Sequence, residues 1–434
     1  MHRTIVFNFI LLLSVCNGSS GTTYRLNETE YEILPRLYEL ENYDACLENP
    51  GAVYCVASLS LHGEPDNRVY NVIQEYSKDT AKHFNYSHID RGICVTKTCE
   101  SYMKTNGLNI NDDLELIVEG CLNEIVEHKY GLNAHLFKLN CDKQTDQGIK
   151  LDYLDYIVGV VIVCLCSLVV AGSYYDIKLR RATDNEKVFP VSENKALLCF
   201  SVFQNTERLS YVDQRDERLF GLKGLHGARV IAEISIVFGH SLTILAIFVS
   251  DPHTLEKAYE SEFRFIFSAL SVVQIFFLMS GFLMTYYLQI HSEKRTISWK
   301  NIPDIVFHRW WKLICPLAFV ASIITTWMRH LGSGPLWKSY ITNGVTQQCR
   351  DYYWAHVFFI NNYFENDRFC LAQTWHLAVD MQLFVIGLVI YFLVQNRSWR
   401  FKAGTLALAT MIGVVSPILQ LLFQNLNGVA QTPT

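Results

Sequence analysis

The sequence predicts a mainly α-helical fold: a multi-pass transmembrane helical bundle behind an N-terminal disulfide-rich, mostly helical luminal or extracellular domain. Three observations predict it. Half of the 434 residues are hydrophobic, which fits a soluble part joined to a membrane part. Apolar segments of about 20 residues recur from residue 151 onward, and each is long enough to cross a bilayer as a helix. Six cysteines precede the first of these segments.

The N-terminal segment has the features of a secreted domain. Residues 1–20 carry an early arginine, a short apolar run and then small residues, which is the pattern of a signal peptide. We therefore expect residues 21–150 to lie in the lumen or outside the cell, with the plasma membrane and the endoplasmic reticulum both compatible. Sequons at Asn27 and Asn85 predict glycosylation on that side.

The cysteines of this domain predict disulfides. An even number in a secreted segment favours bridges, and the sequence does not choose among the pairings; the six residues are Cys46, Cys55, Cys94, Cys99, Cys121 and Cys141. No histidines stand at zinc-site spacing, so we expect no metal. Apolar residues at helical spacing predict helices over 31–40, 69–76 and 113–130.

The first transmembrane helix is predicted at 151–175. Lys178, Arg180 and Arg181 follow it, so residues 176–223 are expected to form a cytosolic linker. A mildly acidic chain with a net charge of −5 and no basic domain argues against nucleic acid as a partner and leaves membrane lipids. Five further spans are predicted at 225–249, 263–288, 313–327, 375–393 and 403–423.

The segment between the fourth and fifth predicted spans should lie outside. It contains Cys349 and Cys370, which we expect to pair. Between them, residues 352–364 are aromatic but too interrupted by polar groups to span the membrane. This stretch therefore lies in the interface or re-enters the membrane.

One predicted span carries ionisable residues on a single face. Arg229 and His240 are eleven residues apart, which leaves them about 20° from each other around a helix. Glu233 lies on the same stripe and could pair with Arg229. Ionisable groups at membrane depth are costly and usually mark function, although a structural Arg–Glu pair and a packed histidine remain the alternative.

Two further motifs bring polar groups to the same bundle. Arg309 lies in a basic, aromatic stretch before the fourth span, where a guanidinium could bind the phosphates of a donor. Asp380 lies near the start of the fifth span, and it is either functional or paired with an arginine of the bundle. Ser280 lies in a bulky apolar run, where packing is the favoured explanation.

Four motifs in one order resemble the membrane acyltransferase-3 family. They are Gly224-Leu225 to Arg229 and His240, the segment Phe276-Phe277 to Ser280-Gly281-Phe282, Arg309 to Pro316, and Trp375 to Asp380 and Gln382. The cysteine-rich first domain resembles the animal branch named for nose resistance to fluoxetine. The resemblance implies a partial acyltransferase-3-like membrane domain over 224–434, because the family has more spans than are predicted here.

The resemblance implies an acyltransferase that moves an acyl group from a donor, acyl-CoA, to a hydroxylated acceptor, with no bound cofactor. His240, Arg229 and Asp380 would be catalytic, with His240 as general base. Substrate contacts would come from Arg309, Glu233, Trp375 and Gln382. Two alternatives remain open: a carrier for lipids or lipophilic cargo that uses the same stripe and the luminal domain, and an inactive truncated scaffold.

Overall fold

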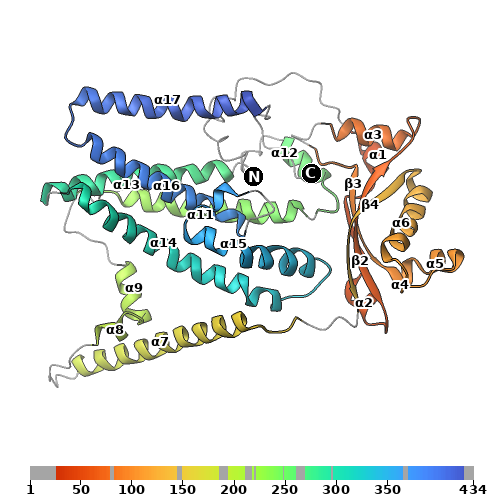
Figure 1. The fold of residues 1–434 in the computed structure, drawn as a ribbon, viewed down its shortest axis with the longest axis horizontal. Coiled ribbons are helices and arrows are strands. Elements are labelled where there is room, and N and C mark those ends of the chain that lie inside the picture. The colour runs from red at the N-terminus through yellow and green to blue at the C-terminus, as the bar shows by residue number, and fades with distance from the viewer. Residues whose placement is uncertain are drawn as a thin grey trace.

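The computed structural model describes residues 26–78, 83–143, 149–184, 194–210, 218, 221–247, 249–260, 269–294, 297–364 and 370–424. The predicted signal peptide lies outside the described residues. The fold has two parts, a mixed α/β domain at one end and a set of long, roughly aligned helices (Figure 1).

The N-terminal domain is built on a four-stranded sheet, so the prediction of a mostly helical domain was wrong in this respect. The sheet order is β1-β3-β2-β4; the strands are β1 (Tyr38–Leu40), β2 (Val53–His62), β3 (His88–Cys94) and β4 (Asn133–Lys143). Only β1 and β3 are parallel. The helices are α1 (Glu28–Glu32), α2 (Tyr43–Leu47), α3 (Arg68–Tyr76), α4 (Val95–Thr98), α5 (Glu100–Asn106) and α6 (Leu114–Tyr130).

The sequence of strand β2 has a mixed pattern. Its first half, Val53–Ala57, is continuously apolar and buried, whereas its second half, Ala57–His62, alternates between apolar and polar residues over only six positions. The strand lies between β3 and β4 in the sheet. The predicted helix over 31–40 is a single helical turn followed by β1. The helices predicted at 69–76 and 113–130 are present as α3 and α6, and Ile117 and Val118 of α6 are fully buried in the domain core.

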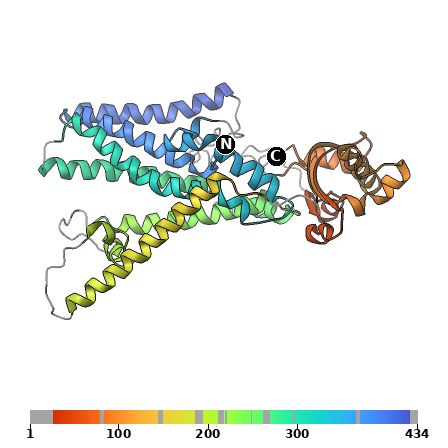
Figure 2. The same ribbon diagram turned by 60° about the horizontal axis from the view of Figure 1, so that its bottom comes forward.

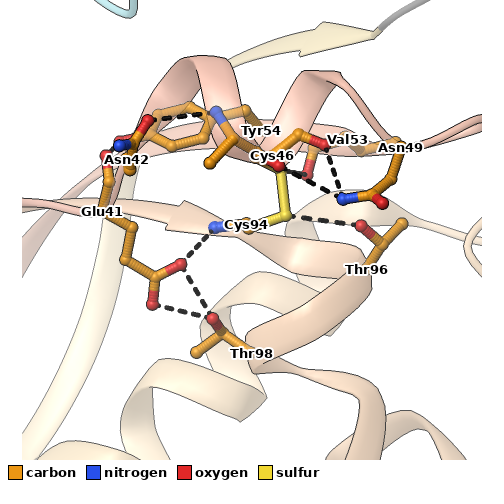
Figure 3. The surroundings of a disulfide bond; sticks show 10 residues. Glu41, Asn42, Cys46, Asn49, Val53, Tyr54, Cys94, Thr96 and Thr98 are labelled. Carbon is orange, nitrogen blue, oxygen red and sulfur yellow. Dashed lines mark hydrogen bonds between the residues drawn. A yellow bond between two sulfur atoms is a disulfide. The ribbon is translucent and has the colours of Figure 1, made fainter.

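Three disulfides staple this domain. Cys46–Cys94 links α2 to β3, Cys55–Cys141 joins directly paired residues of β2 and β4, and Cys99–Cys121 links the start of α5 to α6. Beside the first bridge, the Glu41 carboxylate accepts hydrogen bonds from the Cys94 amide at 2.7 Å and the Thr98 hydroxyl at 2.7 Å (Figure 3). The bridge is therefore fixed from both the strand and the helix that follows it.

Four of the described helical segments are long and apolar enough to cross a membrane: Tyr153–Ala182, Val272–Glu293, Trp299–His330 and Trp375–Val394. They correspond to α7 (Tyr153–Asp184), α13 (Ala269–Lys294), α14 (Ile302–Thr325) and α16 (Trp375–Val394). The second and sixth predicted spans are also helical, as α11 (Lys223–Ile247) and α17 (Trp399–Gln424). The chain is a multi-pass membrane protein. Away from its first turns, α7 diverges from the other helices (Figure 2).

The predicted linker contains two short helices that pack on α7. They are α8 (Lys195–Leu198) and α9 (Val202–Ser210). Ser201 donates to the buried Asp176 carboxylate at 2.5 Å, and Arg180 bridges Asp176 and Glu207. This part of the linker is an ordered extension of the first membrane helix.

The aromatic stretch after α14 turns back along that helix. Its first residues, 352–357, belong to α15 (Gln347–Val357), which follows a π-helical segment, η7 (Trp337–Thr346). Its remaining residues form the turn after α15, with a short 3-10 helix, η8, at Asn361–Tyr363. Arg350 near the start of α15 donates to the Thr325 carbonyl at the end of α14, whereas Trp310 near the start of α14 donates to the Val357 carbonyl at 2.9 Å. The structure therefore shows that α15 packs along α14. The two expectations for this stretch, an interfacial position and re-entry into the membrane, both stay predictions. A Cys349–Cys370 disulfide joins α15 to the chain just before α16.

Candidate functional site

The core of the site is an arginine held by three helices. Arg309 of α14 donates to the Ser280 hydroxyl of α13 at 2.7 Å and forms an ion pair with Asp380 of α16. Its guanidinium carbon also lies 4.2 Å from the centre of the Phe384 ring. Three of the sequence motifs, which are far apart in the chain, thus meet at one cation.

The ion pair between Arg309 and Asp380 is largely buried. The side chains of Arg309 and Asp380 are 24% and 15% exposed, so both charges are largely removed from solvent and depend on each other. The Arg309 Nε atom is buried and has no hydrogen-bond partner among the described residues. Asp380 is therefore paired with an arginine of the bundle, which was one of the two alternatives for it. Ser280, which was expected only to pack, accepts a hydrogen bond from the same guanidinium.

One histidine lies beside this cluster. His376 lies one turn before Asp380 in α16, and its Nδ1 atom is 2.6 Å from the Gln373 carbonyl oxygen. His240 lies on α11, which packs against α13, and α13 packs in turn against α16. A contact of His240 with the cluster stays a prediction.

The polar stripe on α11 is only partly enclosed. Arg229 is half-buried, and Glu233 and His240 are exposed. The described part of the chain contains no ion pair between Arg229 and Glu233, so the pairing expected from their spacing is absent, and both side chains are available for other contacts.

Comparison with known proteins identifies this bundle. A family model described as an acyltransferase domain matches residues 222–434, the region that contains every contact just described. Residues 222–434 are an acyltransferase-3 domain. The chain is also 22% identical over 418 residues to nose resistant to fluoxetine protein 6 of Caenorhabditis elegans. This alignment covers 91% of this chain and 48% of that protein. The chain thus spans about half the length of this relative. No solved structure matches significantly.

Within the acyltransferase-3 domain, Gln382 holds the turn that follows α15. Its side-chain amide donates to the Phe359 carbonyl at 2.8 Å and to the Asn362 side chain at 2.9 Å, and it accepts from Tyr363 at 3.3 Å. Phe359 has a φ of 53°, a left-handed conformation unusual for an aromatic residue. Gln382 therefore stabilises an unusual turn, and a substrate contact by this residue stays a prediction.

Trp375 is also mainly a packing residue. It is 7% exposed, and its ring lies edge-on to Phe277 of α13, with 6.3 Å between ring centres. This contact fixes the start of α16 against α13 and thereby sets the position of His376, the next residue. A direct contact of Trp375 with substrate also remains a prediction.

The N-terminal domain docks on the loop between α11 and α13. Glu256 of α12 (His253–Glu260) is buried and accepts from the Tyr76 hydroxyl and the Phe84 amide, each at 2.7 Å. Burial raises the pKa of this carboxyl. Nearby, Tyr31 stacks on His253 with 4.0 Å between ring centres. The helix that carries His240 is thus tied to the N-terminal domain.

A second docking point lies at the start of α7. Asp155 is fully buried and pairs with Arg329 at 2.5 Å, while Asp152 pairs with Arg350 at 2.5 Å. The hydrogen bond from Arg350 holds the pKa of Asp152 well below its usual range. These pairs attach the first membrane helix to the ends of α14 and α15.

Sequence analysis missed two features of the acyltransferase-3 domain. His376 lies four residues before Asp380 and on the same helix face, but no role was predicted for it, because a histidine at a helix start has many structural explanations. It also gave no sign of Glu256, whose partners lie about 170 residues earlier in the chain. Only the i, i+4 spacing of His376 and Asp380 could have indicated the first.

Proposed function

We propose that the protein is a membrane O-acyltransferase that moves an acyl group from acyl-CoA to a hydroxylated acceptor, with His240 as general base. The observation that carries this proposal is the meeting of α13, α14 and α16 at one polar cluster. Ser280, Arg309 and Asp380 form it, His376 lies one turn from Asp380, and α11, the helix of His240, packs against α13. Such a cluster is costly among apolar helices unless it serves chemistry.

The chemistry needs a base and a way to hold an anionic donor. His240 would take the proton of the acceptor hydroxyl, whose oxygen then attacks the thioester carbonyl carbon. A C–O bond forms, the C–S bond breaks, and the thiolate leaves with the electron pair and regains the proton. His240 suits this role because it is exposed on its helix and so is open to a substrate.

Two arginines would manage the charge of the donor. Arg229 is half-buried on the same stripe as His240 and would orient the donor, with Glu233 nearby as a polar contact. Arg309 would contact donor phosphates through the guanidinium atoms that Asp380 and Ser280 leave open. Asp380 would act by fixing the Arg309 side chain.

The placement of the N-terminal domain follows from the same proposal. With the first domain in the lumen or outside the cell, at the plasma membrane or the endoplasmic reticulum, the basic residues after α7 face the cytosol. Asn27 is exposed, as a glycosylation site there must be, and Asn85 is half-buried.

The test is transfer from radiolabelled acyl-CoA in membranes that contain the full chain. His240→Asn should lower the rate by about 100-fold or more, because a positioned base contributes on that scale. His226→Asn is the matched control, since His226 is an exposed histidine near the start of the same helix. Equal rates for the wild type and His240→Asn would contradict the role of His240, and a wild type without transfer would contradict the enzyme proposal.

A second candidate function is a carrier for lipids or lipophilic cargo. The docking of the luminal domain on α12 favours it, because a transferase does not need that domain to reach His240. The name of the relative, which refers to fluoxetine, also points to a small amphiphile. A carrier predicts cargo movement that survives His240→Asn and is lost on deletion of residues 21–150. An inactive scaffold predicts neither transfer nor movement.

A further inference from the structure

The apolar run of α7 ends at a defined level. Residues 156–175 carry no charge, and about 20 apolar residues are enough to cross the hydrocarbon core of a bilayer as a helix. Tyr174 is exposed at the end of this run, and tyrosine is typical of the boundary between lipid and water. Asp176 and Lys178 then follow. The membrane boundary at this end of α7 therefore lies near residues 172–176.

The helices α8 and α9 dock on α7 at this same level. Gly172 lets the backbone of α8 approach closely, because a Cβ atom at this position would lie 2.6 Å from the Leu197 carbonyl oxygen. The Ser173 hydroxyl accepts a hydrogen bond from the Val202 amide at 3.1 Å. In Figure 1, α9 runs across the direction of α7, as a helix in the plane of the membrane would. The two short helices are therefore fixed at the boundary.

One face of α9 is apolar and exposed. Glu207 pairs with Arg180 and so marks the side of α9 that faces α7. Val202 and Leu209 share the opposite side, at about 140 to 160° from Glu207 around the helix. They are 52% and 88% exposed, and Phe203 beside them is 46% exposed. We call Val202, Phe203 and Leu209 the α9 outer face.

Basic side chains accompany the outer face. Lys195 of α8 and Arg208 of α9 are exposed, and neither forms an ion pair within the part of the chain that the structure describes. Lys178 lies just past the apolar run of α7, with its Nζ atom 4.8 Å from the centre of the Tyr174 ring. An apolar face accompanied by cations is typical of a helix that lies in the interface of an anionic leaflet.

We propose that α8 and α9 form an interfacial membrane anchor, with the α9 outer face in contact with the acyl chains of the leaflet at the C-terminal end of α7. Lys195 and Arg208 lie at the level of the lipid phosphates. By the positive-inside rule this is the cytosolic leaflet, which carries anionic lipids. The anchor holds the end of α7 that diverges from the other helices (Figure 2). It does not depend on acyl transfer.

The test measures lipid contact residue by residue in the full chain, reconstituted in vesicles of phosphatidylcholine and phosphatidylserine. The free thiols Cys164, Cys166, Cys199 and Cys315 are replaced by serine, and this parent chain sets the labelling background. Val202→Cys and Leu209→Cys are each labelled with bimane. Gln204→Cys is the matched control, because Gln204 is exposed on the same helix at about 200° from Val202.

We expect phosphatidylcholine with brominated acyl chains to quench bimane in Val202→Cys and Leu209→Cys but not in Gln204→Cys. Iodide in the water should give the opposite order. All three side chains are exposed, so the labels require no repacking. Quenching of all three labels by iodide and of none by brominated lipid would overturn the anchor, because the outer face would then lie in water. Labels in Val202→Cys and Leu209→Cys that neither quencher reaches would also overturn it, because protein would then cover this face.

Discussion

At the scale of single residues, Arg309 shows how an apolar bundle accommodates a charge. The guanidinium pairs with a carboxylate, donates to a hydroxyl and lies over an aromatic ring, while its Nε atom has no hydrogen-bond partner among the described residues. Taking such a charge out of water costs several kcal/mol, so the pair is stable only as a pair. Arg309 is therefore both a site residue and a tie between three helices.

This predicts an asymmetric response to mutation. Asp380→Leu should destabilise the protein by about 3 kcal/mol, because it leaves Arg309 largely buried without its counter-ion. The double variant Asp380→Leu, Arg309→Met should recover much of that loss. The measurement is the unfolding midpoint of the full chain in detergent. If Asp380→Leu were as stable as the wild type, the Arg309–Asp380 ion pair would make no contribution to stability.

At the scale of elements, α15 and the turn that follows it were not predicted as a helix and a turn from the sequence. Helix α15 runs back along α14, and the turn after it is held by Gln382 of α16. The Cys349–Cys370 disulfide closes this segment into a loop. The site helices α14 and α16 therefore depend on a segment that is neither a membrane span nor a free loop.

Removal of this bridge should loosen the bundle. Cys349→Ser should lower the stability by about 2 to 4 kcal/mol, the usual contribution of a disulfide. Cys315→Ser is the control, because Cys315 is an exposed free thiol on α14. Unfolding midpoints with and without reductant check the prediction. If reductant lowers the midpoint of Cys349→Ser as much as that of the wild type, the loss must come from another disulfide.

At the scale of the whole molecule, the N-terminal domain and the acyltransferase-3 domain are in direct contact. Glu256 accepts hydrogen bonds from Tyr76 and Phe84 of the first domain, although it belongs to the loop between α11 and α13. Asp155 makes the second attachment, between α7 and Arg329. Movement of the N-terminal domain would therefore shift α11, the helix of His240.

This docking should depend on pH. The docked state raises the pKa of Glu256 above its ordinary value of 4.5, so docking favours the protonated carboxyl. Its contribution is fully present below that value and is lost as pH rises through the raised pKa. We expect the unfolding midpoint of the first domain, followed in the full chain by near-ultraviolet circular dichroism, to show this loss. Glu256→Gln should lack it, and an identical pH profile for both chains would contradict the role of Glu256.

The sequence was sufficient for local features and insufficient for distant ones. Long apolar runs predicted each of the four membrane-length helices among the described residues, and helical spacing predicted α3 and α6, because these patterns depend on neighbouring residues. The sheet was missed because the first half of β2 is continuously apolar and buried, and the alternation in its second half is short. The contacts of Arg309 with Ser280 and Asp380 join residues 29 and 71 positions apart, and no local pattern specifies such contacts.

The most direct test of the central claim is the proximity of His240 and His376 in membranes. Each would be changed to cysteine in a chain whose free thiols (Cys164, Cys166, Cys199 and Cys315) are replaced by serine. A short bifunctional thiol reagent should link His240→Cys to His376→Cys, and a paired variant with His226→Cys in place of His240→Cys should stay unlinked. Absence of the first link, or equal linking in both pairs, would contradict a site shared by α11 and α16.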